Sequence, residues 1–230
     1  MKRDWNRRAA PFTLDAHAAV SLHEDPAAPL VVYCHGMSEG PDSLERFWPR
    51  LCALPVHLIA PAGPYAHEVR KGNTLRIGHA WYLYDGSPGP FKESVERVIP
   101  WLRDLLAGLE REHGLKPRIR ALVGYSQGAY FGYAAALRSQ DLFGNLVAVA
   151  GRLKTGFVEP ELQSGGALRT LILHGESDPA TPVDFSARSE AALRDAGFAV
   201  ERQVLPGGHG LRPDRDAAAA AWLRREWKLD

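Results

Sequence analysis

The feature that most constrains the fold of this chain is the regular alternation of short apolar or β-branched runs with longer helical patterns. The runs that read as strands cover residues 30–34, 56–60, 119–123, 145–150, 170–174 and 199–205. Buried runs of this kind, separated by helices, are typical of βαβ units whose parallel sheet is covered on both faces. The pattern therefore predicts an α/β fold with a mostly parallel central sheet flanked by helices.

Helical patterns fill the intervals between these strands. Apolar residues within 95–109 recur every three or four positions, which predicts an amphipathic helix packed on one face of the sheet. Pro100 lies inside this stretch, and a proline there removes a backbone donor and clashes with the preceding turn. We therefore expect either a kink or a helix that begins close to Pro100. Further helices are expected at 184–196, closed by Gly197, and at 214–227.

Two segments are less regular. Residues 12–14 and 18–22 suggest a short antiparallel pair at the edge of the sheet. The stretch from Pro61 to Pro90 contains prolines, glycines and aromatic residues without clear periodicity, and loops of that length are usually functional. Because this stretch carries Trp81 and Tyr82, we expect it to form an aromatic wall of a substrate pocket.

Length and composition set the broad class. The chain has 230 residues, of which 45% are hydrophobic, which predicts one domain over residues 1–230. The 28 basic and 27 acidic residues give no surplus that would favour nucleic acid or stable membrane association. The basic N-terminus runs into no long apolar stretch, so we expect a cytoplasmic protein. We expect Cys34 and Cys52 to be reduced thiols, and sequence leaves both a monomer and a homodimer open.

A G-x-S-x-G motif occupies residues 124–128, between the strand at 119–123 and a helical stretch of small and aromatic residues. This order places Ser126 at a sharp strand-to-helix turn, where the flanking glycines let the strand and the helix approach each other. A serine held at such a turn is a candidate nucleophile. The pentapeptide alone also fits a glycine-rich connection, so the hypothesis depends on partners elsewhere in the chain.

The partners that such a serine needs follow in the required order, first an acid and then a histidine. Asp178 lies in a polar loop after the fifth predicted strand, and His209 lies in the loop after the sixth. Asp178 also fits a turn or a helix N-cap, and Glu176 and Asp85 are weaker candidates for the acid. The pattern predicts a triad in which Ser126 is the nucleophile, His209 the base and Asp178 the acid that orients His209.

Acyl chemistry at Ser126 also needs donors for the negative charge that develops on a carbonyl oxygen. Gln127, directly after the serine, supplies one backbone N–H at a helix N-terminus. The second is expected from the loop after the first strand, where Met37 N–H is the candidate. His35 in the same loop is expected to hold the loop by hydrogen bonds rather than to act in catalysis.

These residues resemble the phospholipase/carboxylesterase family of the α/β-hydrolases, which includes acyl-protein thioesterases and bacterial carboxylesterases. The resemblance covers roughly residues 30–225 and rests on H-G at 35–36, P-A-G-P at 61–64, A-W-Y at 80–82, G-Y-S-Q-G at 124–128, H-G-E-S-D at 174–178 and G-H at 208–209. It implies an α/β-hydrolase fold without a separate cap domain, and a small serine esterase or thioesterase that needs no metal or other cofactor. It also implies oxyanion roles for Met37 and Gln127 and a pocket-wall role for Trp81.

The chain departs from the family pattern at three places. Ser38 stands where a second loop glycine is usual, Ala129 replaces the glycine expected after the S-Q-G core, and the aspartate that tends to follow the aromatic pair is displaced to Asp85. These departures weaken the transfer of a substrate preference from the family to this chain, but not the transfer of the chemistry. Because no cap insertion interrupts the strands, we expect an open site for small or short-acyl esters or thioesters.

Other functions stay open at this point. An acyltransferase would use the same triad with an alcohol or amine in place of water, and a non-catalytic hydrolase-fold binding protein would keep the shape without turnover. A metal hydrolase is disfavoured, because residues 67–71 begin like H-E-x-x-H but end in Lys71.

Overall fold

A seven-stranded sheet crosses the centre of the computed structural model, which describes residues 16–229; the strand expected at 12–14 lies outside the described residues. The strand order is β1-β3-β2-β6-β7-β8-β9. Their bounds are β1 Ala18–Ser21, β2 Leu30–Cys34, β3 His57–Pro61, β6 Arg120–Tyr125, β7 Asn145–Val149, β8 Arg169–Gly175 and β9 Ala199–Leu205. Every neighbouring pair is parallel except β1 with β3, which is antiparallel. The predicted mostly parallel sheet is confirmed, and β1 lies at its edge as expected.

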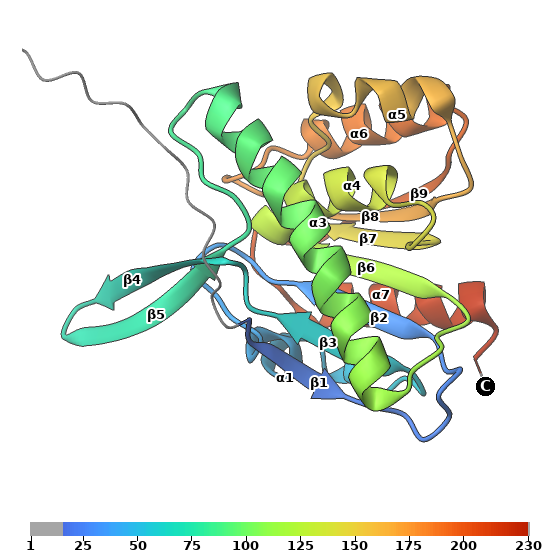
Figure 1. The fold of residues 1–230 in the computed structure, drawn as a ribbon. Helices are drawn as coiled ribbons and strands as arrows, with labels where there is room; N and C mark the ends of the chain where they lie inside the picture. The colour runs from blue at the N-terminus through green and yellow to red at the C-terminus, as the bar shows by residue number, and fades with distance from the viewer. Residues whose placement is uncertain (1–15, 230) are drawn as a thin grey trace, which may run out of the picture.

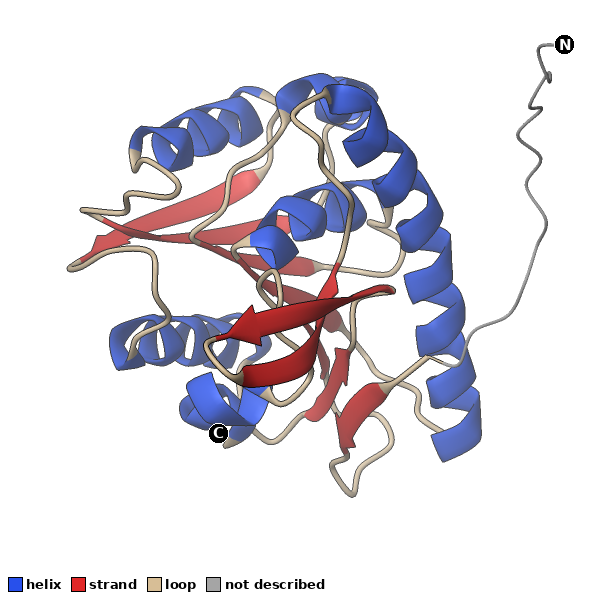
Figure 2. Ribbon diagram, turned by 90° about the vertical axis from the view of Figure 1, so that its left-hand side faces the viewer, coloured by secondary structure: helices blue, strands red, loops and turns tan. Residues whose placement is uncertain are grey.

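Helices cover both faces of this sheet (Figures 1 and 2). One layer contains α3 (Pro88–His113), α4 (Gln127–Arg138), η1 (Thr155–Phe157), α5 (Glu159–Ser164) and α6 (Asp184–Asp195), and the other contains α1 (Ser43–Phe47), α2 (Pro49–Cys52) and α7 (Pro213–Trp227). In β2, Leu30 and Val32 face the first layer, whereas Val31 and Tyr33 face the second. The inner strands β2, β3 and β7 are buried along their whole length on both faces, which explains their continuous apolar runs in the sequence.

The long helix α3 differs from its prediction. It runs without interruption from Pro88 to His113, with Pro100 inside it, so the expectation that a helix begins close to Pro100 is wrong. A proline in a helix interior costs about 3 kcal/mol. Val95, Val98 and Leu102 are almost completely buried against the sheet on either side of Pro100. Burial of three such side chains, at ~1.5–3 kcal/mol each, outweighs that cost.

The segment between β3 and α3 also differs from the expected aperiodic loop. It contains a second, two-stranded antiparallel sheet made of β4 (Tyr65–Lys71) and β5 (Thr74–Ala80). Gly72 has a φ of +59° and, with Asn73, forms the two-residue turn between the strands. This hairpin projects from the body of the molecule (Figure 1). β4 alternates half-buried and exposed side chains and β5 is exposed from Thr74 to Ile77, so neither strand has the alternation of buried apolar residues by which strands are recognised.

The two cysteines are free thiols, Cys34 buried and Cys52 partly buried. Among the residues that the structure describes, no helix combines the length and the apolar character needed to span a membrane.

Candidate active site

Ser126 lies at the carboxyl end of the sheet, in the turn between β6 and α4. Its backbone has φ +50° and ψ −116°, a strained conformation for a residue with a side chain. A Cβ on Gly128 would lie 2.0 Å from the carbonyl oxygen of Cys34, and one on Gly124 would lie 2.4 Å from that of Gly128. The glycines of the motif are therefore required by the close approach of α4 to the ends of β2 and β6.

The three residues of the predicted triad meet at this turn. His209 Nε2 lies 2.8 Å from Ser126 Oγ, and His209 Nδ1 lies 2.8 Å from Asp178 Oδ2. A carboxylate accepts hydrogen bonds only, so Nδ1 carries the proton and Nε2 is left to accept the hydrogen bond from the serine hydroxyl. Ser126 and Asp178 lie 83 and 31 positions from His209 in the sequence, and the fold joins the three residues in one hydrogen-bonded chain.

The Asp178 carboxylate is held from several directions. It is buried, and its Oδ1 accepts hydrogen bonds from the backbone N–H groups of Ala180 at 2.9 Å and Thr181 at 2.8 Å. His174 Nε2 lies 3.4 Å from Oδ2 and donates to the carbonyl oxygen of Thr181 at 2.6 Å. Burial lowers the pKa of His174, so its ring is held neutral beside the carboxylate.

The weaker acid candidates lie elsewhere. The Glu176 side chain is exposed, and Asp85 is exposed and accepts hydrogen bonds from Ser87 at 2.7 Å and 2.9 Å. The hydrogen bond to Ser87 lowers the pKa of Asp85. Of the three acids considered from sequence, the structure brings only Asp178 to His209.

Two residues that sequence reasoning missed hold the loop of His209. The guanidinium of Arg215 is completely buried, and its Nη2 donates to the carbonyl oxygen of Gly208 at 2.9 Å. The Tyr125 hydroxyl donates to the carbonyl oxygen of His209 at 3.2 Å. Tyr125 lies inside the G-x-S-x-G motif, which was a usable signal, whereas a single arginine in the first turn of α7 gave none.

Met37 and Gln127, whose backbone N–H groups are the predicted oxyanion donors, line the same cavity as Ser126 and His209. Within the described part of the chain, neither N–H donates a hydrogen bond, and both residues line the cavity. A serine-linked oxyanion needs free donors of this kind. Their placement fits the expected oxyanion roles, which stay predictions.

A buried polar network holds the loop that carries Met37. His35 Nδ1 lies 2.7 Å from the carbonyl oxygen of Gly36, and the Gly63 N–H donates to His35 Nε2 at 3.0 Å. One ring nitrogen therefore donates and the other accepts, which only neutral histidine can do. Burial lowers the pKa of His35 to about 4, in keeping with a neutral ring. His35 thus holds the loop, as expected.

The β4–β5 hairpin closes the other side of this loop. The Ser38 N–H donates to the carbonyl oxygen of His79 at 2.9 Å, the His79 N–H donates to that of Glu39 at 2.9 Å, and Ser38 Oγ lies 2.9 Å from His67 Nε2. Ser38 has a φ of +66°, the left-handed conformation that favours glycine. Its hydrogen bonds with His79 and His67 explain how a serine is held where a glycine is expected.

Glu39 closes the loop on itself, because its Oε2 accepts the hydrogen bond of the Gly36 N–H at 3.0 Å. Burial raises the pKa of this carboxyl.

Trp81 does not line the cavity, in contrast to the expected pocket wall. Its side chain is completely buried, stacks on Phe131 at 5.0 Å between ring centroids, and donates from Nε1 to the carbonyl oxygen of His35 at 2.9 Å. The side chain of Gln127 accepts from Trp81 N–H at 2.9 Å and donates to the carbonyl oxygen of Tyr82 at 3.1 Å. Trp81 therefore supports the loop of His35 from the core, whereas Tyr82 lines the cavity.

The cavity around Ser126 has a volume of about 730 Å³. A second cavity of about 750 Å³ adjoins it, and the two share Tyr84, Arg152 and Lys154 as lining residues. Among the described residues, no group of three or more histidine, cysteine or carboxylate side chains is placed to hold a metal ion. The arrangement is suited to covalent chemistry at a serine.

Comparison with known proteins gives a consistent result. The family described as Phospholipase/Carboxylesterase matches residues 15–224. Esterase YpfH of Escherichia coli (strain K12) is 23% identical over 201 residues, covering 85% of this chain and 82% of that protein. Acyl-protein thioesterase 1 of Saccharomyces cerevisiae is 21% identical over 220 residues, covering 90% and 96%.

Solved structures share the architecture. Esterase PE8 superposes with a TM-score of 0.72 and 27% identity, covering 92% of this chain and 99% of the other. The Bacillus cereus carboxylesterase also gives a TM-score of 0.72, with 16% identity and coverages of 91% and 94%. The predicted α/β-hydrolase fold is confirmed.

Proposed function

This chain belongs to the phospholipase/carboxylesterase family, and from that premise we propose that it hydrolyses small carboxylic esters or thioesters through an acyl-enzyme formed on Ser126. The observation that carries the proposal is the hydrogen-bonded chain from Ser126 Oγ through His209 to Asp178, with 2.8 Å at each step, at a cavity of about 730 Å³. Metal ions and other cofactors take no part in the proposed reaction.

In the first half of the reaction, Ser126 Oγ attacks the carbonyl carbon and its proton passes to His209 Nε2. The carbonyl oxygen gains a negative charge, which the N–H groups of Met37 and Gln127 stabilise. Asp178 holds the Nδ1–H tautomer of His209 and stabilises the imidazolium that forms. When the tetrahedral intermediate collapses, the bond to the alcohol or thiol breaks, and the leaving group takes the proton from His209.

In the second half, water takes the place of the leaving group. His209 removes a proton from the water, the resulting oxygen nucleophile attacks the acyl carbon, and Ser126 Oγ leaves with the proton that His209 returns. The same N–H groups stabilise the second oxyanion. The products are the carboxylic acid and the free enzyme.

We extend the proposal to the organisation of the chain and to its substrates. A single sheet whose strands come from residues 18 to 205 supports one domain over residues 1–230. Tyr82 in the cavity wall supports a role in binding the apolar part of a substrate. Because residues 16–229 form no separate domain that covers Ser126, small or short-acyl substrates suit the cavity better than long lipids.

Labelling with a fluorophosphonate probe tests this proposal, since the probe reacts only with an activated serine. We expect one label on Ser126, found by peptide mass spectrometry, together with turnover of 4-nitrophenyl butyrate. A chain that is folded but unlabelled would support the non-catalytic binding protein. Product analysis in the presence of added alcohols separates hydrolysis from acyl transfer, because a transferase would yield a new ester in place of the acid.

A further inference from the structure

A pair of cations occupies the wall that separates the two cavities. Arg152 and Lys154 lie in the loop after β7, and both line the cavity of Ser126 and the second cavity beside it. The second cavity adds the cations Lys92 and Arg188 and an apolar lining that includes Phe91 and Phe157, and no acidic side chain of the described residues lines it.

The loop that carries this pair is held firmly. Leu153, between the two cations, is buried, and its N–H donates to Ser189 Oγ at 2.9 Å. A Cβ on Gly151 would lie 2.5 Å from Cβ of Ala129, so the loop is pressed against α4. Arg152 and Lys154 therefore stand on either side of a fixed, buried residue, which reduces the entropy lost when they bind a ligand.

Aromatic rings, rather than carboxylates, contact the two cations. Arg152 lies over the Phe185 ring at 4.2 Å, and Lys154 Nζ lies 3.8 Å from the centre of the Phe91 ring and 4.5 Å from that of Tyr84. Cations over ring faces are stabilised, but they keep donors free for an anion.

Neither Arg152 nor Lys154 has an ion-pair partner among residues 16–229. Other partly buried arginines do have one: Arg120 pairs with Glu110 at 2.8 Å, and Arg138, although it also lies over Phe157, pairs with Glu161 at 3.2 Å. Burial and the neighbouring charge of Arg152 lower the pKa of Lys154, as expected for a cation without an anionic partner. In a chain with a net charge of only +1, two unpaired cations facing the site are a local exception.

We infer that Arg152 and Lys154 form an anion-binding subsite, so that the preferred substrates are esters or thioesters whose non-reacting part carries a carboxylate or phosphate group. The inference rests on the proposed function, because it concerns the substrate of the same site. An anion bound by both side chains replaces the missing carboxylate partner. The apolar rings in the lining of the adjoining cavity lower the local dielectric constant beside the two cations and so strengthen the electrostatic attraction.

Matched substrates test the subsite. The 4-nitrophenyl monoester of adipic acid carries a carboxylate, and the corresponding amide is neutral and nearly the same size. We expect wild-type enzyme to hydrolyse the acid with a kcat/KM on the order of 10- to 100-fold higher than the amide, the range expected for hydrogen bonds to a charged group. The preference should decrease as salt is added.

Two further substrate comparisons identify the anion and its position. The phosphonate 4-nitrophenyl 5-phosphonopentanoate, compared with the adipate, shows whether phosphate-like or carboxylate groups bind better. The pair 4-acetoxybenzoate and 4-acetoxybenzamide places the charge on the leaving group instead of the acyl group. A preference for the anion over its neutral partner, in the adipate pair or in the acetoxybenzoate pair, supports the subsite, whereas equal rates in both pairs would overturn it.

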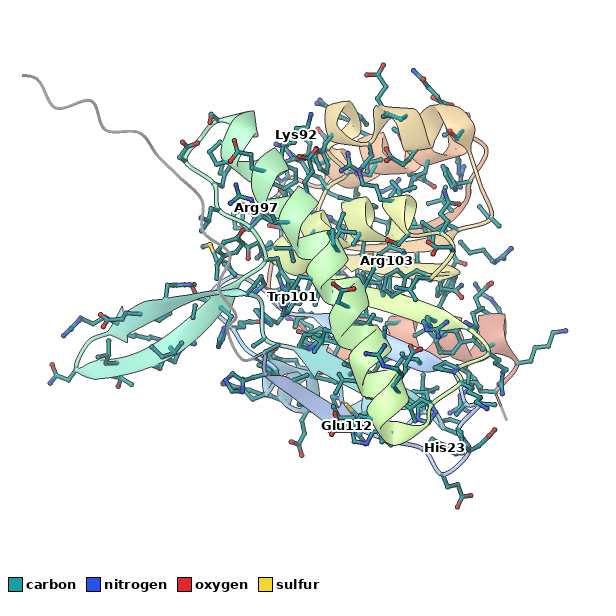
Figure 3. The ribbon with its side chains drawn as sticks, viewed as in Figure 1. His23, Lys92, Arg97, Trp101, Arg103 and Glu112 are labelled. Atoms are coloured by element: carbon teal, nitrogen blue, oxygen red, sulfur yellow. The ribbon has the colours of Figure 1, made fainter. Side chains whose placement is uncertain are left out.

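Variants assign the preference to the two residues. The double substitution Arg152→Gln and Lys154→Met should reduce the acid-to-amide ratio to near one. The matched control is Arg97→Gln, which removes one positive charge from an exposed position farther along α3 than Lys92 (Figure 3). This control should keep the wild-type ratio. A ratio that survives the double substitution, or that falls equally in the control, would overturn the inference.

The ratio also separates the two proposals. If the enzyme hydrolyses the anionic and the neutral member of both pairs at equal rates, the esterase proposal stands and the subsite fails. If fluorophosphonate does not label Ser126 and neither ester is hydrolysed, the proposed function fails first.

Discussion

The two sides of the cavity around Ser126 are built from different kinds of atoms. On the acid–base side, which consists of Ser126, His209 and Asp178, side chains form the hydrogen-bonded chain. On the donor side, the free groups are the backbone N–H groups of Met37 and Gln127. A side-chain function requires a residue type, whereas a backbone function requires only a conformation. A single substitution in Ser126, His209 or Asp178 should therefore abolish the function of the acid–base side. The donor side should lose its function only when the residues that hold its loops are changed.

The largest effect is expected from Ser126→Ala. This substitution removes the proposed nucleophile and should lower kcat on 4-nitrophenyl butyrate by about 10⁶-fold, as for other serine nucleophiles. Circular dichroism should show the wild-type fold, since His209 is the one hydrogen-bond partner of the serine hydroxyl in the described part of the chain. Retention of more than a tenth of the activity would show that another residue is the nucleophile.

Asp178→Asn should have the next largest effect. The asparagine oxygen can still accept the N–H groups of Ala180 and Thr181, but its amide group would then face His209 as a donor and favour the wrong tautomer. We expect kcat to fall by about 10³- to 10⁴-fold.

The matched control for this variant is Glu176→Gln, an exposed acid in the same loop, which should stay near the wild-type rate. A larger loss in Glu176→Gln than in Asp178→Asn would reverse the assignment of the acid.

Sequence reasoning was most successful where burial or chemistry leaves a residue pattern. The strand expected at 30–34 matches β2 (Leu30–Cys34), because a strand inside a covered sheet appears as a compact apolar or β-branched run. Ser126, Asp178 and His209 were recognised because each follows such a strand. The acid–base side was thus predictable residue by residue.

The features that could not be predicted from the sequence depend on tertiary contacts. The β4–β5 hairpin is only half-buried on one face of β4, and its apolar Leu75 and Ile77 are exposed, so burial imposes little apolar alternation, although its Gly72-Asn73 turn was a usable signal. The burial of Trp81 depends on Phe131, which lies 50 positions away in sequence and beside it in the fold. The lack of a carboxylate near Arg152 is likewise visible only once the chain is folded.

The free energy of unfolding should depend on pH through His35, which holds the loop on the donor side. Burial lowers the pKa of His35 to about 4, from an ordinary value of about 6.5. As the pH falls between these values, the unfolded chain binds a proton at His35 before the folded chain does, so stability is complete above about pH 6.5 and decreases towards pH 4. The contribution of His35 over this range is about 3 kcal/mol.

The His35→Gln variant isolates that contribution, because other titrating groups such as His174 are unchanged. Urea unfolding followed from pH 7 to pH 4 should show a smaller decrease in the free energy of unfolding for the variant than for wild type. If the two proteins lose equal stability over this range, His35 is not held neutral by the fold.

The smallest effect is expected from a change at Trp81, and it shows whether this residue supports the loop of Met37 or contacts the substrate. Trp81→Phe keeps a ring to stack on Phe131 but removes the hydrogen bond from Nε1 to the carbonyl oxygen of His35. Because the loop of Met37 would be held less firmly, we expect kcat to fall by about 10-fold, less than the loss from removing an oxyanion donor outright. Acetyl, butyryl and octanoyl esters should be affected equally. Tyr82→Ala, which removes a side chain that lines the cavity, should instead raise KM and change the order of preference among the three esters. A changed chain-length preference in Trp81→Phe would show that Trp81 acts on the substrate rather than on the loop.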